Sequence, residues 1–509
     1  MKGTLIRSLF PYRLREFQGE FLSFVQRGIG EGKPVLVDAA TGFGKTALIL
    51  AAALPEALNR GLRVVWAVRT GSETDRPVEE LKVICKRKGV KLFGLSFRGK
   101  RDMCLLLRDL NLSGRVGHEE ASLVCEAYRG KCAYRLNLEG LDWEELELFA
   151  REPRLYAETL NFCVERKVCP YRVQLLLLDR ARLLALSYNY VIDPRISRFM
   201  RAKVGFRNSV LVVDEAHNLQ QAAGEANSDR ITGGTVERAM KEAEAMGDRD
   251  LAGFLDAMAG YFQKFLEGMG GEEALFPLEE CAWKCAGGVA EFKELCGEAR
   301  RLGNKLRRKR LLEGKAPRSS LHHLGDFWLK AVENFGVDGV ALTAAKEGGA
   351  LAVELSDMRS GELLGGLWGE FKACVFCSGT LKPFEAYAEV VGLNDYEAKG
   401  FPSPYPKRNV ASFITKGLST RGEELSDEMA ELYVEALNAF IASLNVNLAV
   451  FASSYRVQRR LLELGLRRLA EARGREVFIE EQNMRGEEGR ALMEKFKACA
   501  GGARKGALV

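Results

Sequence analysis

Short runs of consecutive apolar residues recur along the chain, and stretches with helical spacing separate them. The clearest runs are residues 35–37, 64–68, 210–213 and 373–377. Apolar runs of this length are typical of strands that are buried on both faces of a parallel sheet. Helical spacing appears in residues 17–25, and an apolar helix is expected at residues 47–53. The pattern predicts an α/β fold, in which ligands bind at the carboxyl ends of the strands.

A glycine-rich turn follows the first apolar run and precedes the expected helix. Its glycines allow backbone N–H groups to close on phosphate oxygens, and Lys45 adds a positive charge. The Thr46 hydroxyl is suited to bind Mg²⁺. Ala39 stands where the usual phosphate loop has its first glycine, and this small residue still fits. The predicted phosphate ligands are Thr41, Gly42, Gly44, Lys45 and Thr46.

Arg15 and Gln18 precede this turn and lie one helical turn apart. Their spacing fits three roles: holding the edge of an adenine base, holding the phosphate loop itself, or forming an ordinary surface pair. Both are therefore candidate nucleotide-binding residues.

Two carboxylates end the strand that is predicted at residues 210–213. Because parallel strands end at the same edge of a sheet, Asp214 and Glu215 should face the phosphate loop. Asp214 can hold the Mg²⁺ that bridges the terminal phosphates, and Glu215 can orient and deprotonate the attacking water. His217 is placed to sense the γ-phosphate. Together with Lys45, these residues are the predicted catalytic group of an ATP hydrolase.

Five of the twelve cysteines lie between residues 96 and 171, where the strand pattern breaks down. This stretch is highly charged and offers little core of its own, so four thiolates around a metal would stabilise it. Iron–sulfur, zinc and plain buried thiols are the alternatives, because paired CxxC knuckles are absent while Pro170 follows the last cysteine. The five are Cys104, Cys125, Cys132, Cys163 and Cys169.

Residues 230–345 predict an inserted helical domain, because no comparable strand pattern interrupts their polar, helical spacing. The basic run at residues 300–310 predicts either a solvated helix face or a guide for a phosphate backbone. The sheet resumes with the run that ends at Ser378, whose hydroxyl is suited to relay the phosphate state. Further strands, which give a second α/β domain, are predicted at residues 448–455, 477–480 and 506–509.

Composition narrows the class of protein. Apolar residues make up 47% of the 509 residues, which fits a globular protein. No apolar run reaches the ~18 residues of a membrane span. The net charge of +6 permits a nucleic-acid partner without establishing one. No export signal is evident, so the cysteines are not expected to form disulfides and the protein is expected in the cytoplasm.

Taken together, the motifs resemble those of the XPD family of superfamily 2 DNA helicases, close to its archaeal members. The resemblance covers nearly the whole chain, and its most specific feature is the cysteine quartet between the first two ATPase motifs. The motifs, in family order, are the phosphate loop, residues 68–70, the cysteines, residues 187–194, the DEAH sequence at residues 214–217, residues 378–381 and residues 451–455.

The resemblance implies two RecA-like motor domains, the second incomplete, with an iron–sulfur domain and a helical arch domain inserted in the first. It also implies an ATP-driven motor that moves 5′→3′ on single-stranded DNA, unwinds duplex DNA and acts in DNA repair. The implied boundaries are 1–98, 173–229 and 346–395 for the first motor domain, 99–172 for the iron–sulfur domain, 230–345 for the arch and 396–509 for the second motor domain.

Cofactors, partners and residue roles follow from the same resemblance. A [4Fe-4S] cluster, ATP and Mg²⁺ are the implied cofactors. Single-stranded DNA, forked DNA and repair proteins are the expected partners of a monomeric archaeal protein that does not bind membranes. The implied cluster ligands are Cys104, Cys125, Cys132 and Cys169, with Cys163 as a spare. The implied nucleic-acid contacts are Arg69, Thr70, Tyr188 and Tyr455.

Two alternatives stay open at the level of sequence. Family members continue beyond this point with a glycine-rich DNA-contacting motif and an arginine-bearing helix. The alternative function is therefore a DNA- and ATP-binding subunit with little turnover. A nuclease-linked or RNA-directed helicase of the same superfamily would have a similar ATP site, although no extra acidic nuclease cluster is visible.

Overall fold

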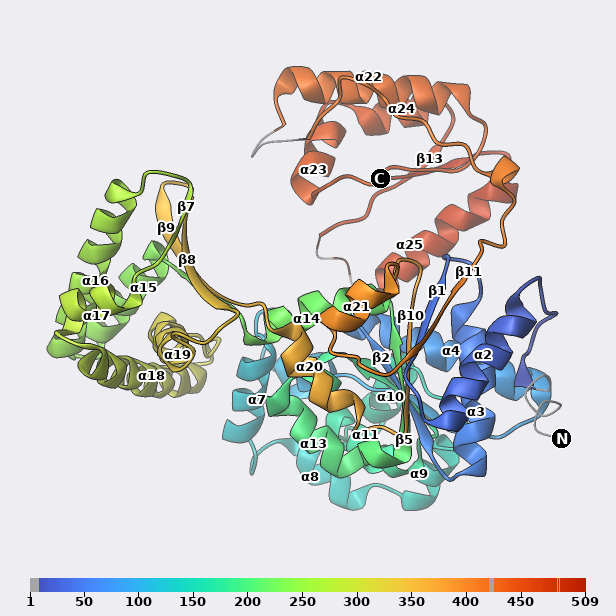
Figure 1. The fold of residues 1–509 in the computed structure, drawn as a ribbon, viewed down its shortest axis with the longest axis horizontal. Coiled ribbons are helices and arrows are strands. Elements are labelled where there is room, and N and C mark those ends of the chain that lie inside the picture. Colours follow the sequence, from blue (N-terminus) through green and yellow to red (C-terminus); the bar gives the residue numbers. More distant parts are fainter. Residues whose placement is uncertain (1–8, 421–424, 483, 485) are drawn as a thin grey trace. The chain divides into compact units, whose positions relative to one another are not determined.

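The computed structural model of the chain describes residues 9–420, 425–482, 484 and 486–509. The chain divides into two compact units, Met1–Pro404 and Tyr405–Val509, each with its own sheet. Figure 1 shows the elements of both units. Within the described residues, no helix combines the length and the apolar content needed to cross a membrane.

A parallel sheet of seven strands forms the centre of the first unit, in the order β11-β1-β10-β5-β2-β4-β3. The α/β fold that the apolar runs predicted is confirmed. β11 pairs with β1, so this strand belongs to the first unit and not to the second domain, where the sequence had placed it. The strands are β1 (Val35–Ala39), β2 (Arg63–Val68), β3 (Gly94–Ser96), β4 (Leu183–Ser187), β5 (Ser209–Asp214), β10 (Ala373–Ser378) and β11 (Glu397–Phe401).

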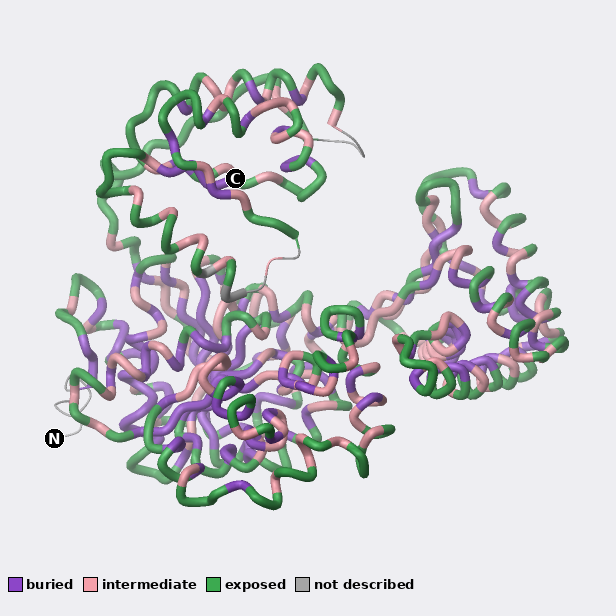
Figure 2. Tube along the Cα trace, turned by 180° about the vertical axis from the view of Figure 1, so that it is seen from behind, coloured by how far each residue is buried: buried purple, intermediate pink, exposed green. Residues whose placement is uncertain are grey.

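Successive side chains of these strands point to opposite faces, so the sheet carries two cores. Val64 and Trp66 of β2 pack on one face, whereas Val65 and Ala67 pack on the other. Figure 2 shows buried residues concentrated in this layer. The first face is covered by α2 (Gln18–Glu31), α3 (Lys45–Asn59) and α4 (Asp75–Lys88). The second is covered by α12 (Asn189–Ile192), α13 (Pro194–Val204), α14 (Leu219–Asn227), α20 (Ser360–Trp368) and α21 (Phe384–Val390), together with three helices of the segment described next.

The segment between β3 and β4 is helical and carries the predicted cluster cysteines; we call it the cysteine segment. Part of it packs on the main sheet, and the rest has only a small apolar cluster that includes Leu107 and Val124. The limited core agrees with the sequence analysis. The helices are α5 (Lys100–Met103), α6 (Leu105–Asp109), α7 (His118–Ala127), α8 (Ala133–Leu136), α9 (Trp143–Phe149), α10 (Tyr156–Glu165) and α11 (Pro170–Leu177).

Residues 229–357 form a helical insertion that also contains an antiparallel sheet, in the order β6-β9-β8-β7. The sequence predicted a helical domain here because it shows no apolar run comparable to the buried strands, and these four strands were missed. Gly348 and Gly349 have positive φ angles and turn the β8–β9 hairpin. The helices are α15 (Gly233–Ala245), α16 (Arg249–Gly268), α17 (Leu278–Ala286), α18 (Val289–Leu312) and α19 (Ser320–Glu333). The strands are β6 (Asp229–Thr232), β7 (Glu273–Leu275), β8 (Val340–Glu347) and β9 (Ala350–Asp357).

The basic run on α18 is only partly solvated. Arg307 is 3% exposed and donates to Glu119 Oε1 of the cysteine segment at 2.8 Å. Leu311, one turn further along, joins the apolar cluster of that segment. The helical insertion therefore contacts the cysteine segment through a buried cation and an apolar side chain.

The second unit contains a parallel sheet of three strands in the order β12-β14-β13. β14 occupies the middle of this sheet, which confirms the strand that was predicted at residues 506–509. The strands are β12 (Leu448–Ala449), β13 (Glu476–Phe478) and β14 (Gly506–Leu508). The helices are α22 (Asp427–Ser443), α23 (Tyr455–Glu463), α24 (Leu466–Ala472) and α25 (Gly486–Ala498).

Candidate functional site

The predicted phosphate loop connects β1 to α3. Gly42 and Gly44 have φ angles of 81° and 94°, a region that favours glycine. A Cβ atom at Gly44 would lie 3.2 Å from Gln18 Nε2, so this position also has little room for a side chain. The helix begins at Lys45, and the unpaired N–H groups of its first turn are available to an anion. Locally, this is an anion-binding loop at a helix N-terminus.

Arg15 and Gln18 both hold this loop. Arg15 Nη2 donates to the carbonyl oxygens of Gly42 and Phe43, each at 2.8 Å. Gln18 Nε2 donates to Phe43 O at 2.7 Å, and Gln18 Oε1 accepts from the Arg15 N–H at 2.8 Å. Of the roles that the sequence left open, the structure favours contact with the loop itself.

Lys45 is a nearly buried cation whose Nζ donates to Ala39 O at 2.9 Å. It also acts on the Cys377 thiol of β10. Burial raises the pKa of Cys377 well above its usual value, Asp214 raises it further, and Lys45 opposes the rise. The predicted lysine and the predicted carboxylate therefore influence one and the same sulfur atom.

β10 lies between β1 and β5 and joins the two halves of the site. Its register places Cys377 beside Asp214. On its other side, a Cβ atom at Gly379 would lie 3.6 Å from Ala39 O, at the start of the phosphate loop. The loop and the Asp214 carboxylate thus stand at the same edge of the sheet, separated by the end of one strand.

Both oxygens of the Asp214 carboxylate have a protein donor. Trp66 Nε1 donates to Oδ2 at 3.3 Å, and Cys377 Sγ donates to Oδ1 at 3.4 Å. Burial raises the pKa of Asp214, and the bond from Cys377 opposes that rise. Sequence reasoning missed Trp66 and Cys377 as partners, because a tryptophan or a cysteine in a buried strand is ordinarily a core residue.

Glu215, His217 and Ser378 form a hydrogen-bonded group next to Asp214. Ser378 Oγ donates to Glu215 Oε2 at 3.2 Å and lies 2.6 Å from His217 Nδ1. His217 Nδ1 is also 3.4 Å from Glu215 Oε2. Glu215 has a φ of 47°, which is uncommon for a residue with a side chain and marks a constrained turn. The serine links β10 to both predicted catalytic side chains of the turn.

Tyr188, which was predicted to contact nucleic acid, lies in the core of the protein. Its side chain is 1% exposed, and its hydroxyl donates to the backbone carbonyls of Asp214 and Glu215. Burial raises the pKa of this hydroxyl above its usual value. Because the side chain is buried beneath the turn after β5, the predicted contact with nucleic acid is corrected to a supporting role.

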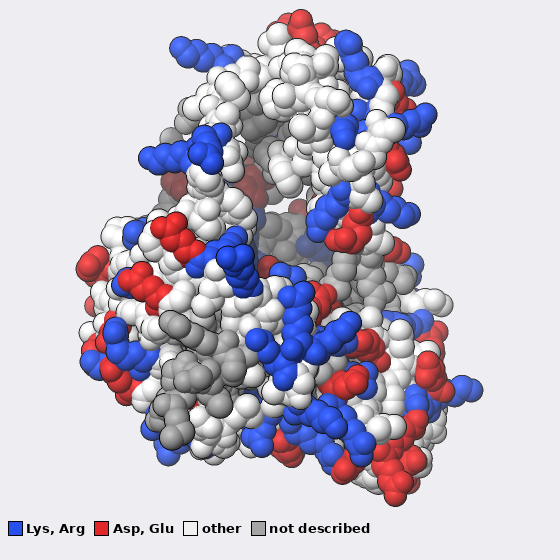
Figure 3. Space-filling model, turned by 90° about the vertical axis from the view of Figure 1, so that its right-hand side faces the viewer, with Lys and Arg blue, Asp and Glu red and all other residues white. Residues whose placement is uncertain are grey.

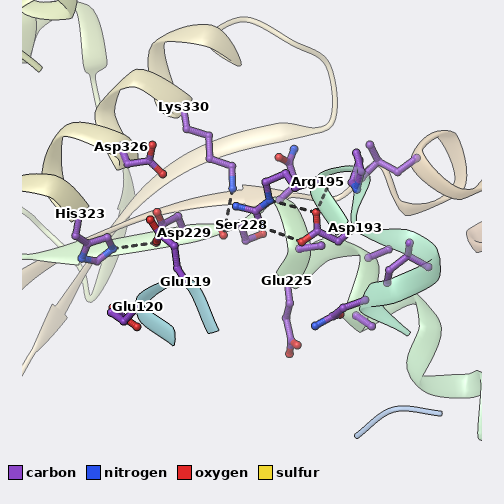
Figure 4. Close-up of a pocket in the computed structure, with 18 of the residues that line it drawn as sticks. Glu119, Glu120, Asp193, Arg195, Glu225, Ser228, Asp229, His323, Asp326 and Lys330 are labelled. Atoms are coloured by element: carbon purple, nitrogen blue, oxygen red, sulfur yellow. Dashed lines mark hydrogen bonds and ion pairs between the residues drawn. The ribbon is translucent and has the colours of Figure 1, made fainter. Parts of the chain in front are cut away.

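Arg69 and Thr70 line a cavity of about 820 Å³ that also involves the helical insertion and the cysteine segment. Arg69 is exposed and donates from Nη1 to Asn218 Oδ1 at 3.1 Å. Sequence reasoning missed this cavity, since its walls come from segments far apart along the chain. The charged residues labelled around it in Figure 4 are Glu119, Glu120, Asp193, Arg195, Glu225, Asp229, His323, Asp326 and Lys330.

Pairing reduces the charge inside this cavity. Arg195 Nη2 lies 3.0 Å from Asp193 Oδ2, and His323 Nε2 lies 3.1 Å from Asp229 Oδ1. The bond from Asp229 raises the pKa of His323, and burial lowers the pKa of Lys330. The cavity wall is therefore mixed in sign rather than uniformly basic.

Tyr455 belongs to the second unit, where it begins α23. Ser454 caps this helix, because its hydroxyl accepts the Val457 N–H at 3.3 Å. The tyrosine is partly exposed. Its predicted contact with nucleic acid stays a prediction.

The four predicted cluster cysteines lie in one neighbourhood. Cys104, Cys132 and Cys169 each directly precede a short helix, and Cys125 lies within α7. Burial raises the pKa of Cys104 to about 11, the Leu107 N–H opposes this rise, and Cys169 and Cys125 add to it. Burial likewise raises the pKa of Cys169, with smaller contributions from Cys125 and Cys132. The thiols thus act on one another electrostatically.

The chemistry of these four cysteines fits a metal centre that is held by thiolates. Backbone N–H groups at the helix starts partly oppose the rise that burial causes in the pKa of Cys104 and Cys169, and so favour the thiolate, the form that metals bind. Nevertheless, among the residues that the structure describes, no group of three or more His, Cys, Asp or Glu side chains has metal-binding spacing. Cys163 is fully buried in the main core, and its expected role as a spare stays a prediction.

Comparison with known sequences points to one group of proteins. The DEAD_2 family profile matches residues 66–236. The XPD/RAD3 helicase subunit of the general transcription and DNA repair factor IIH from Saccharomyces cerevisiae is 22% identical over 263 residues, which cover 47% of this chain and 33% of the relative. A regulator of telomere elongation helicase 1 homolog from Caenorhabditis elegans is 24% identical, over 43% of this chain and 23% of that protein. The matched part of the chain thus spans about a third or less of these relatives.

These two relatives are eukaryotic and give no support to the predicted archaeal source. Solved structures extend the likeness in fold. One described as XPD_Helicase has a TM-score of 0.61 at 18% identity and covers 97% of this chain and 80% of its own. The structure of S. tokodaii Xpd4 has a TM-score of 0.53 at 17% identity with the same coverage. Residues 66–236 thus match the DEAD_2 family, the chain is similar in sequence to XPD-type helicases, and its fold is like that of solved XPD structures.

Proposed function

We propose that the chain is an ATP-dependent DNA helicase of the XPD type, which moves 5′→3′ on single-stranded DNA, separates duplex strands and acts in DNA repair. The observation that supports this most directly is the position of Lys45 and Asp214. They stand on either side of the end of β10 and both act on Cys377. A phosphate loop opposite a strand-end carboxylate is the arrangement that nucleotide hydrolysis requires.

Each residue of this site has its own role in the proposal. The N–H groups of the loop and Lys45 bind the phosphates, while Thr46 and Asp214 would hold Mg²⁺. When bound, Mg²⁺ neutralises charge on the terminal phosphates. Glu215 orients the attacking water and accepts its proton, and His217 and Ser378 hold the Glu215 carboxylate in place.

Single-stranded and forked DNA are the proposed partners. Arg69 lies at the carboxyl end of β2 and lines the cavity of about 820 Å³, where it is available to a phosphate. Elsewhere on the cavity wall, Asp193 and Asp229 are paired with Arg195 and His323. The proposed DNA contact therefore depends on Arg69 and not on a general positive charge of the cavity.

We further propose that Cys104, Cys125, Cys132 and Cys169 would hold a [4Fe-4S] cluster. When bound, the cluster would link the small apolar cluster around Leu107 and Val124 to α8 and to α11, which packs on the main sheet. Iron and sulfide analysis of anaerobically purified protein tests this proposal. We expect both elements to be present, together with absorbance at about 400 nm. Zinc in place of iron would refute it, and Cys163→Ser is the matched control for each ligand substitution.

The proposed function is tested by ATP hydrolysis and strand separation. We expect hydrolysis to rise with single-stranded DNA and less with RNA of the same sequence, and duplexes with a 5′ tail to be unwound in preference to those with a 3′ tail. Equal stimulation by RNA would favour the RNA-directed alternative. Nucleotide and DNA binding without any turnover would instead favour a binding subunit.

A further inference from the structure

A second pocket, of about 390 Å³, opens beside the phosphate loop. Because Gly44 and Thr46 are part of its wall, a nucleotide whose phosphates occupy the loop would extend its base into this space. The pocket borders α2, α3 and α4. Figure 3, which views the molecule from the right-hand side of Figure 1, shows Lys and Arg side chains interspersed with Asp and Glu. Its lining residues include Tyr12, Arg13, Gly44, Thr46, Arg76 and Glu80.

Glu80 is the unusual residue of this lining. It lies on α4 and is 5% exposed, and no residue that the structure describes gives its Oε1 atom a hydrogen-bond partner. Buried acceptors are nearly always paired in folded proteins, because losing water without a replacement is costly. An unpaired carboxylate oxygen on a pocket wall indicates a donor that arrives with a ligand.

The neighbouring polar groups are already engaged. Arg15 and Gln18 hold the carbonyl oxygens of the phosphate loop. Burial raises the pKa of the Tyr12 hydroxyl, and the nearby Glu80 carboxylate raises it further. The Oε1 atom of Glu80 is therefore an acceptor in this pocket wall that still has no partner among the described residues.

We propose that Glu80 Oε1 accepts a hydrogen bond from the exocyclic amino group of the nucleotide base, and that the site thereby selects a 6-aminopurine. This rests on the proposed nucleotide site and adds the residue that reads the base. Adenine carries an amino group at position 6, whereas hypoxanthine and guanine carry a carbonyl oxygen there. A carbonyl oxygen facing the carboxylate would leave two acceptors opposed and unpaired.

The test is the affinity of the full chain for ADP and for inosine diphosphate, measured by calorimetry with Mg²⁺ present. For the unaltered chain we expect ADP to bind at least about tenfold more tightly, the effect of one hydrogen bond to a buried charged group. Glu80→Gln can turn its amide to face either base, so the ratio should fall to within about threefold. Glu79→Gln, the same change at the neighbouring residue outside the pocket lining, should keep the original ratio.

The outcomes separate this inference from the proposed function. Equal loss of ADP and inosine diphosphate binding in Glu80→Gln would mean that Glu80 only supports Tyr12, which overturns the inference. Equal binding of both nucleotides by the unaltered chain also overturns it and leaves the nucleotide site intact. If the unaltered chain binds neither nucleotide, the nucleotide site and the inference both fail.

Discussion

The Cys377 thiol donates to Asp214 Oδ1 across a pair of parallel strands, at 3.4 Å. Trp66 Nε1 holds the other carboxylate oxygen from the strand on the far side. The Glu215 N–H also donates to Oδ1, at 3.0 Å. The orientation of the carboxylate proposed to hold Mg²⁺ is therefore set by the two neighbouring strands and by the turn that follows β5.

Removing the thiol should change how the site responds to pH. Burial raises the pKa of Asp214, and the bond from Cys377 counteracts this. Cys377→Ala therefore raises the Asp214 pKa further, and the acid limb of the pH–rate profile for ATP hydrolysis should move to higher pH. Cys374→Ala, on the same strand but in the opposite core, is the control and should leave the acid limb in place.

Loss of the loop cation should separate hydrolysis from DNA binding. Lys45→Ala removes the positive charge beside the phosphates, and hydrolysis should fall at least about 100-fold, as for other charge-stabilising groups in such sites. The affinity for single-stranded DNA, measured by fluorescence anisotropy without nucleotide, should stay within about twofold, since Lys45 is nearly buried. Retained hydrolysis in this variant would remove Lys45 from the site.

Because Arg15 holds the phosphate loop, changing this residue should weaken the affinity for ATP. Arg15→Lys loses the planar fork that reaches two carbonyl oxygens, and ATP should bind about tenfold more weakly, because a hydrogen bond from a charged group contributes about 1.5–3 kcal/mol. Arg27→Lys is the matched control on the adjacent helix, with an exposed ion pair to Glu397. Equal affinity in the two variants would show that the loop is held without Arg15.

The contact between the helical insertion and the cysteine segment should depend on Arg307. Its guanidinium is buried and reaches Glu119, which is mostly exposed. Arg307→Met should increase hydrogen exchange in α7, whereas Glu119→Gln should have a smaller effect because solvent screens that carboxylate. Arg301→Met, at an exposed ion pair of the same helix, should leave exchange in α7 unchanged.

Sequence alone predicted the part of the site that is local along the chain. The phosphate loop follows from Gly42, Gly44 and Lys45 in one turn, and Asp214 follows from a buried run that ends in carboxylates. The roles of Trp66 and Glu80 were not visible in the sequence. Trp66 contacts Asp214, which is distant along the chain, and Glu80 lines a pocket that only the folded chain forms. A tryptophan in an apolar run and a glutamate on a charged helix have no local signal.

The fold shows a similar limit. The strands buried on both faces were evident as apolar runs, and even the short strand β14 was recognised. The β8–β9 hairpin was missed, since the alanines and charged residues of β8 resemble a polar helix and only pairing with β9 settles the conformation. Tyr188 was predicted to contact nucleic acid from its motif. The motif does not show that the side chain is buried, because burial depends on tertiary packing.

The central claim is that the Lys45 loop and Asp214 form one site for a nucleotide with its cation. The most direct test is the equilibrium affinity for ATP with and without Mg²⁺, in the unaltered chain and in Asp214→Asn. The account predicts that Mg²⁺ tightens ATP binding at least about tenfold in the unaltered chain and has almost no effect in Asp214→Asn, because the carboxylate that holds the cation is gone. A gain with Mg²⁺ that is equally large in Asp214→Asn would contradict it.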